Sequence, residues 1–125
     1  MLCMAAKDDF GRAGEQRAAA HLRARGFDVL DRNWRTAGGE VDVVARRADA
    51  LVFVEVKTRT TDGFGDPLEA VDVRKRARLW RLANAWCAQH PELARGRARR
   101  LDVIGITGAD PATARLEHVE DVPWA

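Results

Sequence analysis

The sequence contains no serine and no tyrosine, and these absences remove whole classes of enzyme. Serine hydrolases and enzymes that transfer strands through a tyrosine nucleophile are excluded, because both attack through that hydroxyl. No glycine-rich phosphate loop or dinucleotide-binding motif is present, so work driven by nucleotides is not indicated. No apolar run approaches the roughly 18 residues of a membrane span, and the N-terminus lacks a secretory signal pattern. We therefore expect a cytoplasmic protein without a membrane-spanning segment.

Cysteine and histidine are also scarce. Cys3 and Cys87 form no metal-binding or redox spacing, and His21, His90 and His118 are scattered along the chain. No zinc-ligand spacing connects these residues, so a zinc site is not predicted. We expect each histidine to lie at the surface or at an interface.

Arginine, by contrast, is abundant. All but three of the 21 basic residues are arginines, although the formal net charge is only +2. Arginine binds phosphate through two parallel hydrogen bonds, which suits a nucleic-acid partner. Alanine is also heavily used, so biased genome composition is an alternative explanation for the excess. The position of each arginine therefore matters more than the number.

The most informative segment is a pair of acidic strand sequences. Gly39-Glu40-Val41-Asp42 is followed, after a turn near Ala48-Asp49, by Leu51-Val52-Phe53-Val54-Glu55-Val56-Lys57. Because side chains alternate along a strand, Glu40 and Asp42 share one face, and Glu55 and Lys57 share one face of the next strand. In a hairpin of this register Asp42 faces Glu55 and Glu40 faces Lys57, with opposed Cβ atoms about 5 Å apart.

Two carboxylates that face each other in a half-buried sheet repel, and the repulsion is relieved by a cation. Mg²⁺ or Mn²⁺ suits such a site, because both prefer oxygen ligands and serve phosphate chemistry. Lys57 would then place its ammonium beside the metal, available to an attacking water or a phosphate oxygen. Alternatively, the acids form a structural salt-bridge cluster, with Glu40 paired to Lys57 and Asp42 to a nearby arginine.

A third acid is predicted to reach the same place from a helix. Asp8 and Asp9 can cap a helix over about residues 10–25, and Gly26 follows at the usual position just past a helix end. The small apolar face of this helix contains Gly11, Glu15, Ala18, Ala19 and Leu22. Glu15 therefore points toward the core, which favours a metal cluster. The alternatives are a partner arginine or a helix register one residue away.

The remaining pattern predicts an α/β fold in a single domain over residues 1–125, with its core over about residues 8–120. Strands are expected at 27–33, 39–42, 51–57, 99–106 and 115–120, a short helical turn with a capping box at 66–69, and an arginine-rich connector at 92–100. The order α-β-β-β-α-β-β predicts a central mixed sheet with a helix on each face. The sequence leaves open whether Asp102 faces the site or solvent, and Trp124 is expected to dock on the body.

The second long helix, expected at 73–89 between its cap Asp72 and Pro91, is two-sided. Its predicted apolar stripe contains Val73, Ala77, Trp80, Ala83 and Cys87, widened by Leu79, Leu82 and Trp86. Its opposite face carries arginines at helical spacing, Arg74, Arg78 and Arg81, which suits either a nucleic-acid backbone or ordinary solvent. Lys75 lies at the start of the side of the helix that contains Leu79, so we expect its side chain to point toward the sheet edge nearer the acids. The polar loop at 58–65 leaves directly from the acids, and Arg59 is its natural phosphate contact.

Several of these segments together resemble a known family. The residues that carry the resemblance are Gly11-x-x-Gly14-Glu15, Gly26-Phe27, Arg32-Asn33-Trp34-Arg35, Gly39-Glu40-Val41-Asp42, Val52-Phe53-Val54-Glu55-Val56-Lys57, Glu69-Ala70-Val71 and Lys75. Over roughly residues 11–106 the chain resembles the bacterial YraN-like proteins, a largely uncharacterised group similar to the restriction-endonuclease-like (PD-(D/E)xK) and Holliday-junction-resolvase nucleases. Val41 stands where the wider superfamily has its proline before Asp42.

The resemblance implies a restriction-endonuclease-like sandwich with a metal-dependent nuclease site. It implies that Asp42 and Glu55 ligate Mg²⁺ or Mn²⁺ with help from the Val56 carbonyl, and that Glu15 completes the site. Lys57 would stabilise the attacking hydroxide or the developing charge on the phosphate. A resolvase-like enzyme that cuts two strands would also form a homodimer.

The sequence therefore predicts a metal-dependent nuclease acting on DNA. The expected catalytic residues are Glu15, Asp42, Glu55 and Lys57, and the expected nucleic-acid contacts are Arg35, Arg59, Lys75 and Arg78. An alternative is a non-catalytic accessory protein on a nuclease scaffold, in which arginines bind nucleic acid and the acids only hold structure. A third hypothesis, a protein-interaction module, depends on whether any of Trp80, Trp86 and Trp124 is exposed.

Overall fold

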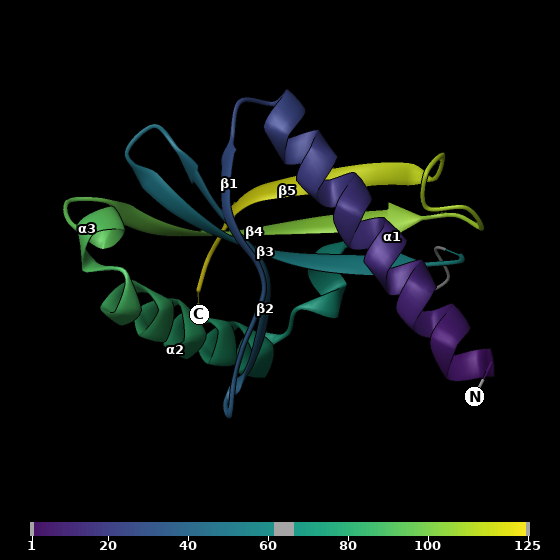
Figure 1. The fold of residues 1–125 in the computed structure, drawn as a ribbon, viewed down its shortest axis with the longest axis horizontal. Coiled ribbons are helices and arrows are strands. Elements are labelled where there is room, and N and C mark those ends of the chain that lie inside the picture. Colours follow the sequence, from purple (N-terminus) through teal and green to yellow (C-terminus); the bar gives the residue numbers. More distant parts are fainter. Residues whose placement is uncertain (1, 62–66, 125) are drawn as a thin grey trace.

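The computed structural model describes residues 2–61 and 67–124, with side chains from residue 9 onward. In that part the chain forms a mixed, open, five-stranded sheet whose strands lie in sequence order (Figure 1). The strands are β1 (Asp28–Thr36), β2 (Gly39–Arg47), β3 (Ala50–Arg59), β4 (Ala98–Thr107) and β5 (Arg115–Val122). β3 and β4 are parallel, and the other neighbours are antiparallel. The predicted mixed α/β class and the order of its long elements are confirmed.

The two long helices, α1 (Leu2–Ala24) and α2 (Val73–Gln89), cover opposite faces of the sheet (Figure 1). The core is therefore divided into two layers. On the α1 side, Leu22 packs with Val52 and Val54, whereas on the α2 side Trp86 packs with Leu51 and Phe53. The alternation of β3 side chains produces this division, and both faces of β3 are apolar because both are covered.

Helix α1 begins earlier than predicted, at Leu2 rather than near residue 10. Asp8 and Asp9 therefore lie inside the helix and do not cap it, because the preceding alanine, leucine and methionine residues are good helix formers. The end is as predicted: Gly26 follows with a φ of 88°, a conformation that favours glycine. No helix in the described part of the chain is long and apolar enough to cross a membrane.

Strand β1 is longer than the predicted strand at 27–33. Trp34 and Arg35 belong to the strand and not to the following turn, because they pair with Val41 and Glu40 of β2. The turn is thereby reduced to Ala37-Gly38. This extension brings Arg35 directly beside Glu40.

The β2–β3 hairpin has the predicted register. Its turn lies at Ala48-Asp49, and its ladder runs from the pair Arg47–Ala50 to the pair Val43–Val54. Continued by one pair, the same register sets Asp42 opposite Glu55. The local sequence pattern was therefore sufficient to align the two acids.

Helix α2 starts as predicted, because the Asp72 carboxylate accepts a hydrogen bond of 2.9 Å from the Lys75 backbone N–H. Its buried face is centred elsewhere than expected: it consists of Leu79, Leu82, Ala83, Trp86 and Cys87. The predicted stripe is wrong at Val73 and Trp80, which are 67% and 39% exposed. Trp80 packs on Trp124, the residue before the last, with ring centroids 5.0 Å apart.

The stretch after α2 is not only a connector. The short helix α3 (Pro91–Ala94) occupies its start, with proline in the first turn, where a missing N–H has no effect. A 3-10 helix, η1 (Pro67–Ala70), accounts for most of the predicted turn at 66–69; Asp66 lies outside the described residues. β5 is an edge strand as predicted, and Trp124 docks by donating a hydrogen bond of 3.1 Å from Nε1 to the Arg99 carbonyl.

Candidate functional site

The candidate site begins with a close approach between α1 and β3. Gly14 is buried at this crossing, and a Cβ atom there would overlap the Thr58 side chain. Glycine therefore permits the helix to lie directly on the strand. The next residue, Glu15, is half-buried between helix and sheet, as the helical pattern predicts.

Asp42 lies in β2 one residue beyond the end of the β2–β3 ladder, which stops at the pair Val43–Val54, and it is only 8% exposed. Its carboxylate accepts a hydrogen bond of 2.8 Å from the Val56 backbone N–H. This bond ties Asp42 to β3 beside Glu55, which is also 8% exposed. Two buried acids are thereby placed next to each other.

A third and a fourth carboxylate join them. Oxygen atoms of Glu15, Glu40 and Asp42 lie within 4.8 Å of one another, and the charge of Glu55 acts on both Glu15 and Asp42. Glu40 was not among the predicted metal ligands. The signal for it was present, because Glu40 and Asp42 alternate onto one face of β2.

Burial and neighbouring acids raise the pKa values of Asp42 and Glu15. Burial raises the pKa of Asp42 to about 9, with repulsion from Glu55 and Glu15 adding to the effect and the Val56 hydrogen bond opposing it. Burial also raises the pKa of Glu15, with repulsion from Glu40, although Arg32 and Asn33 oppose the rise. A cation placed among these groups would favour their ionised forms.

Two basic side chains contact the cluster from outside. Arg35 Nε lies 2.5 Å from Glu40 Oε2 in an exposed ion pair, and Lys75 Nζ lies 2.6 Å from Glu55 Oε2 in a mostly buried one. Glu40 therefore pairs with Arg35, whereas the salt-bridge alternative paired it with Lys57. The reason is that β1 extends far enough to bring Arg35 across from Glu40. Asp42 has the Val56 N–H as its partner rather than an arginine.

Lys57 lies exposed at the end of β3. It lines a shallow hollow together with Arg59, Glu69 and Ala70. The ammonium in contact with Glu55 is that of Lys75. Roles for Lys57 in catalysis and for the Val56 carbonyl in metal binding remain predictions.

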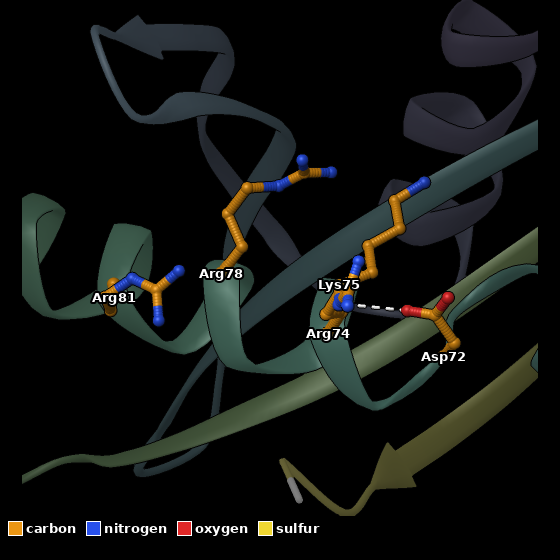
Figure 2. Close-up of a pocket in the computed structure, with 5 residues that line it drawn as sticks. All are labelled: Asp72, Arg74, Lys75, Arg78 and Arg81. Atoms are coloured by element: carbon orange, nitrogen blue, oxygen red, sulfur yellow. Dashed lines mark hydrogen bonds between the residues drawn. The ribbon is translucent and has the colours of Figure 1, made fainter.

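The predicted nucleic-acid contacts are distributed over three places. Arg35 and Lys75 are engaged by the acids, and Arg59 lines the hollow with Lys57. Arg78 lies in a basic pocket along the first turns of α2, which is lined by Asp72, Arg74, Lys75, Arg78 and Arg81 (Figure 2). Lys75 and Arg78 extend from the helix in a similar direction (Figure 2). The basic pocket therefore borders the acid cluster through Lys75.

A second polar cluster was missed from the sequence. Asp102 is fully buried, and its carboxylate oxygens accept hydrogen bonds of 2.9 and 3.0 Å from Arg100 and 2.7 Å from His118. His118 in turn lies 3.0 Å from His21. The prediction of a surface or interface position is wrong for His118, whose side chain is 5% exposed. The participants come from α1, β4 and β5, so no local spacing reveals the cluster.

Of the three tryptophans on which an interaction module would depend, Trp86 is buried and Trp124 is packed against the body. Trp80 alone of these three is exposed, and only partly, at 39%. A continuous exposed tryptophan surface is therefore not formed by them. The interaction-module hypothesis, which needs one of the three to be exposed, therefore rests on Trp80 alone and stays a prediction.

The fold and site thus define a mixed α/β protein with an acidic cluster bordered by a basic helix. Comparison with known protein families gives a match: the model of the uncharacterised protein family UPF0102 matches residues 14–106. The chain belongs to this family. It is 49% identical over 119 residues to a UPF0102 protein of Arthrobacter sp. (strain FB24), covering 95% of this chain and 99% of the relative. A UPF0102 protein of Paenarthrobacter aurescens (strain TC1) is 47% identical over 122 residues, covering 98% and 99%.

Proposed function

We propose that this protein is a divalent-metal-dependent nuclease that hydrolyses phosphodiester bonds in DNA. The observation that carries the proposal is the gathering of four carboxylates from α1, β2 and β3 at one largely buried place: Glu15, Glu40, Asp42 and Glu55. Repulsion among them favours a bound dication. The arrangement of helices and strands around them supports the restriction-endonuclease-like sandwich that the resemblance implies.

The donor set fits a hard metal ion, because it consists of carboxylate oxygens. Asp42 and Glu55 would hold Mg²⁺ or Mn²⁺, with Glu15 and the Val56 carbonyl completing the protein's share of the ligands. When bound, such an ion lowers the pKa of a water molecule and polarises a phosphate. Zinc fits less well, since neither histidine nor cysteine is part of this group.

The basic residues around the acids suit a polyanionic substrate. Lys57 follows Glu55 by two residues, so its exposed ammonium would stabilise charge that develops on the phosphate. The basic pocket of α2, with Arg74, Arg78 and Arg81, would bind neighbouring phosphates of the backbone. The acids would thus act on one phosphodiester while the helix holds the strand.

The test is cleavage of supercoiled, duplex, single-stranded, flapped and branched DNA by the purified protein with Mg²⁺ or Mn²⁺. Asp42→Asn and Glu55→Gln should each lower the cleavage rate by about 100-fold or more, since each removes a metal ligand. DNA binding should persist in both variants. Glu92→Gln makes the same chemical change at an exposed acid outside the cluster and should cleave like the wild type.

A specific observation also favours the accessory-protein alternative: the basic pocket is formed largely by arginines that do not contact the acid cluster. On this alternative, Arg78→Ala would weaken binding and reduce its salt dependence, whereas Asp42→Asn would have no effect on function. Wild-type protein that binds all these DNA forms but cuts none of them would reject the nuclease and support the alternative.

A further inference from the structure

The ion pair between Lys75 and Glu55 differs from the other contacts of the acid cluster. Lys75 lies in the first turn of α2, where its backbone N–H is fixed by the Asp72 cap. From there its side chain extends away from the helix (Figure 2). Its Nζ lies 2.6 Å from Oε2 of Glu55 on β3. The two side chains are only 24% and 10% exposed, whereas Arg35 in the pair with Glu40 is 77% exposed.

The position of this ammonium matters because Glu55 is an expected metal ligand. An ammonium and a divalent metal ion are both attracted to the negative charge of a carboxylate. Two cations on one half-buried carboxylate repel each other strongly. Without any cation, a buried Glu55 beside Asp42 would be costly. Lys75 therefore supplies in the metal-free protein the positive charge that a metal ion would supply.

We propose that Lys75 is an internal counter-ion of the metal centre, which neutralises Glu55 in the metal-free protein and is displaced when Glu55 ligates a divalent cation. This inference rests on the proposed function, since it needs the acids to bind a metal. It assigns Lys75 a role different from that of Lys57, which is exposed at the end of β3. Lys75 is a positioning residue for the metal and, once displaced, a ligand for phosphate.

Displacement has a consequence for DNA. The Lys75 side chain already lines the basic pocket with Arg74, Arg78 and Arg81, so the released ammonium adds its charge to that pocket. Metal binding would then strengthen DNA binding, and DNA binding would strengthen metal binding by the same factor. The ion pair thus couples the two ligands and disfavours metal binding in the absence of nucleic acid.

The test is calorimetric titration of Mn²⁺ into wild type, Lys75→Met, Lys75→Arg and Arg81→Met, without nucleic acid. Lys75→Met removes the competing cation and should bind Mn²⁺ about tenfold more tightly than wild type. Lys75→Arg retains a cation and should stay close to wild type. Arg81→Met is the matched control, because it removes one positive charge from the same pocket, and its affinity should change by less than about twofold.

A second measurement uses the unaltered protein and does not depend on a variant that folds. The chain has three lysines, so reductive methylation followed by peptide mass spectrometry resolves Lys75 from Lys57. Mn²⁺ should make Lys75 react severalfold faster, because its ammonium leaves Glu55. The Asp42→Asn, Glu55→Gln double variant should show no such metal effect.

The outcomes separate this inference from the proposed function. If wild type binds Mn²⁺ and folded Lys75→Met binds it equally or more weakly, the counter-ion role is wrong and the metal site stands. If wild type binds and Lys75 is methylated at the same rate with and without Mn²⁺, displacement is likewise wrong. If neither wild type nor Lys75→Met binds Mn²⁺, with or without duplex DNA, the metal site and the counter-ion role both fail.

Discussion

Two buried aspartates in the same sheet have opposite electrostatic surroundings. Asp102 on β4 is fully buried but is satisfied by Arg100, by His118 and by the Asp121 backbone N–H. Burial raises its pKa, yet these hydrogen bonds outweigh burial and hold the pKa below the ordinary value. Asp42 on β2 is similarly buried, but it lies beside other acids and its pKa rises to about 9.

This contrast separates a structural acid from a candidate metal ligand. Burial alone does not distinguish them, since both aspartates are largely removed from solvent. The neighbouring groups distinguish them. A carboxylate paired with an arginine is already neutralised, whereas a carboxylate surrounded by other carboxylates needs a cation such as a metal ion.

The largest expected effect separates Asp102→Asn from Asp42→Asn in chelator at neutral pH. Asp102→Asn should lower the free energy of unfolding by about 3 kcal/mol, because it removes the fully buried charge that Arg100 and His118 both contact. Asp42→Asn should raise the free energy of unfolding, because Asp42, with a pKa of about 9, must take up a proton on folding at neutral pH. The amide needs no proton and can still accept from the Val56 N–H. Urea unfolding of both variants measures this, and equal losses would refute the contrast.

The next effect is stabilisation by metal. At a Mn²⁺ concentration about 100 times its Kd, wild type should gain about 2.7 kcal/mol in the free energy of unfolding, because the ion binds only the folded site. Asp102→Asn should gain a similar amount, since Asp102 lies outside the proposed metal site, in a cluster that has its own basic residues. Asp42→Asn should gain nothing. Thermal unfolding with and without Mn²⁺ makes the comparison, and an equal shift in Asp42→Asn would place the ion elsewhere.

A smaller effect concerns the helix that carries Glu15 to the acids. Gly14→Ala should lower the free energy of unfolding by about 1–3 kcal/mol, because the new methyl group overlaps Thr58. Mn²⁺ affinity should fall as well, because α1 is pushed away from β3. The control is Gly11→Ala in the same helix, where a Cβ meets nothing within 4 Å; it should raise stability by about 0.5–1 kcal/mol. Similar losses in both variants would contradict the role of Gly14.

The smallest effect is a dependence of stability on pH. Because the pKa of Asp102 is lower in the folded state than its ordinary value of 3.8, the unfolded state takes up a proton first. The stability that this carboxylate contributes is complete above that ordinary value and is lost as the pH falls through the folded value. Protonation removes the charge but retains the carboxyl group, so the loss in the free energy of unfolding should be smaller than that caused by Asp102→Asn.

The corresponding measurement is urea unfolding of wild type and of Asp102→Asn at a series of pH values at and below about 5. The difference in free energy between wild type and Asp102→Asn should shrink as the pH falls. A difference that stays constant down to acid unfolding would show that the charge of Asp102 does not contribute.

Much of the fold was predictable because its signals are local. The alternation of Glu40 and Asp42 and the turn at Ala48-Asp49 determined the hairpin and its register. The glycine after the first helix indicated where that helix ends. The apolar helix face that carries Glu15 was equally predictable from the sequence. Errors concentrated where an element's limit depends on its neighbours, as in β1, which extends to Thr36 because β2 pairs with it.

Parts of the site were not predictable from spacing. The partner of Glu55 is Lys75, twenty positions later on another element, and the closer Lys57 lies exposed. His21 and His118 are almost a hundred positions apart and meet beside Asp102. Local periodicity carries no information on such contacts, because they depend on how a helix is placed on the sheet.

The sequence by itself determined which residues share a face and therefore which acids line up across the hairpin, because strand alternation and helical repeat are properties of the backbone. Only the tertiary structure decided which charges are compensated. It gave Asp102 an arginine and a histidine, left Asp42 among carboxylates, and placed the Lys75 ammonium on Glu55. The pKa of a buried carboxylate depends on the charges within a few ångströms, and folding alone brings those charges together.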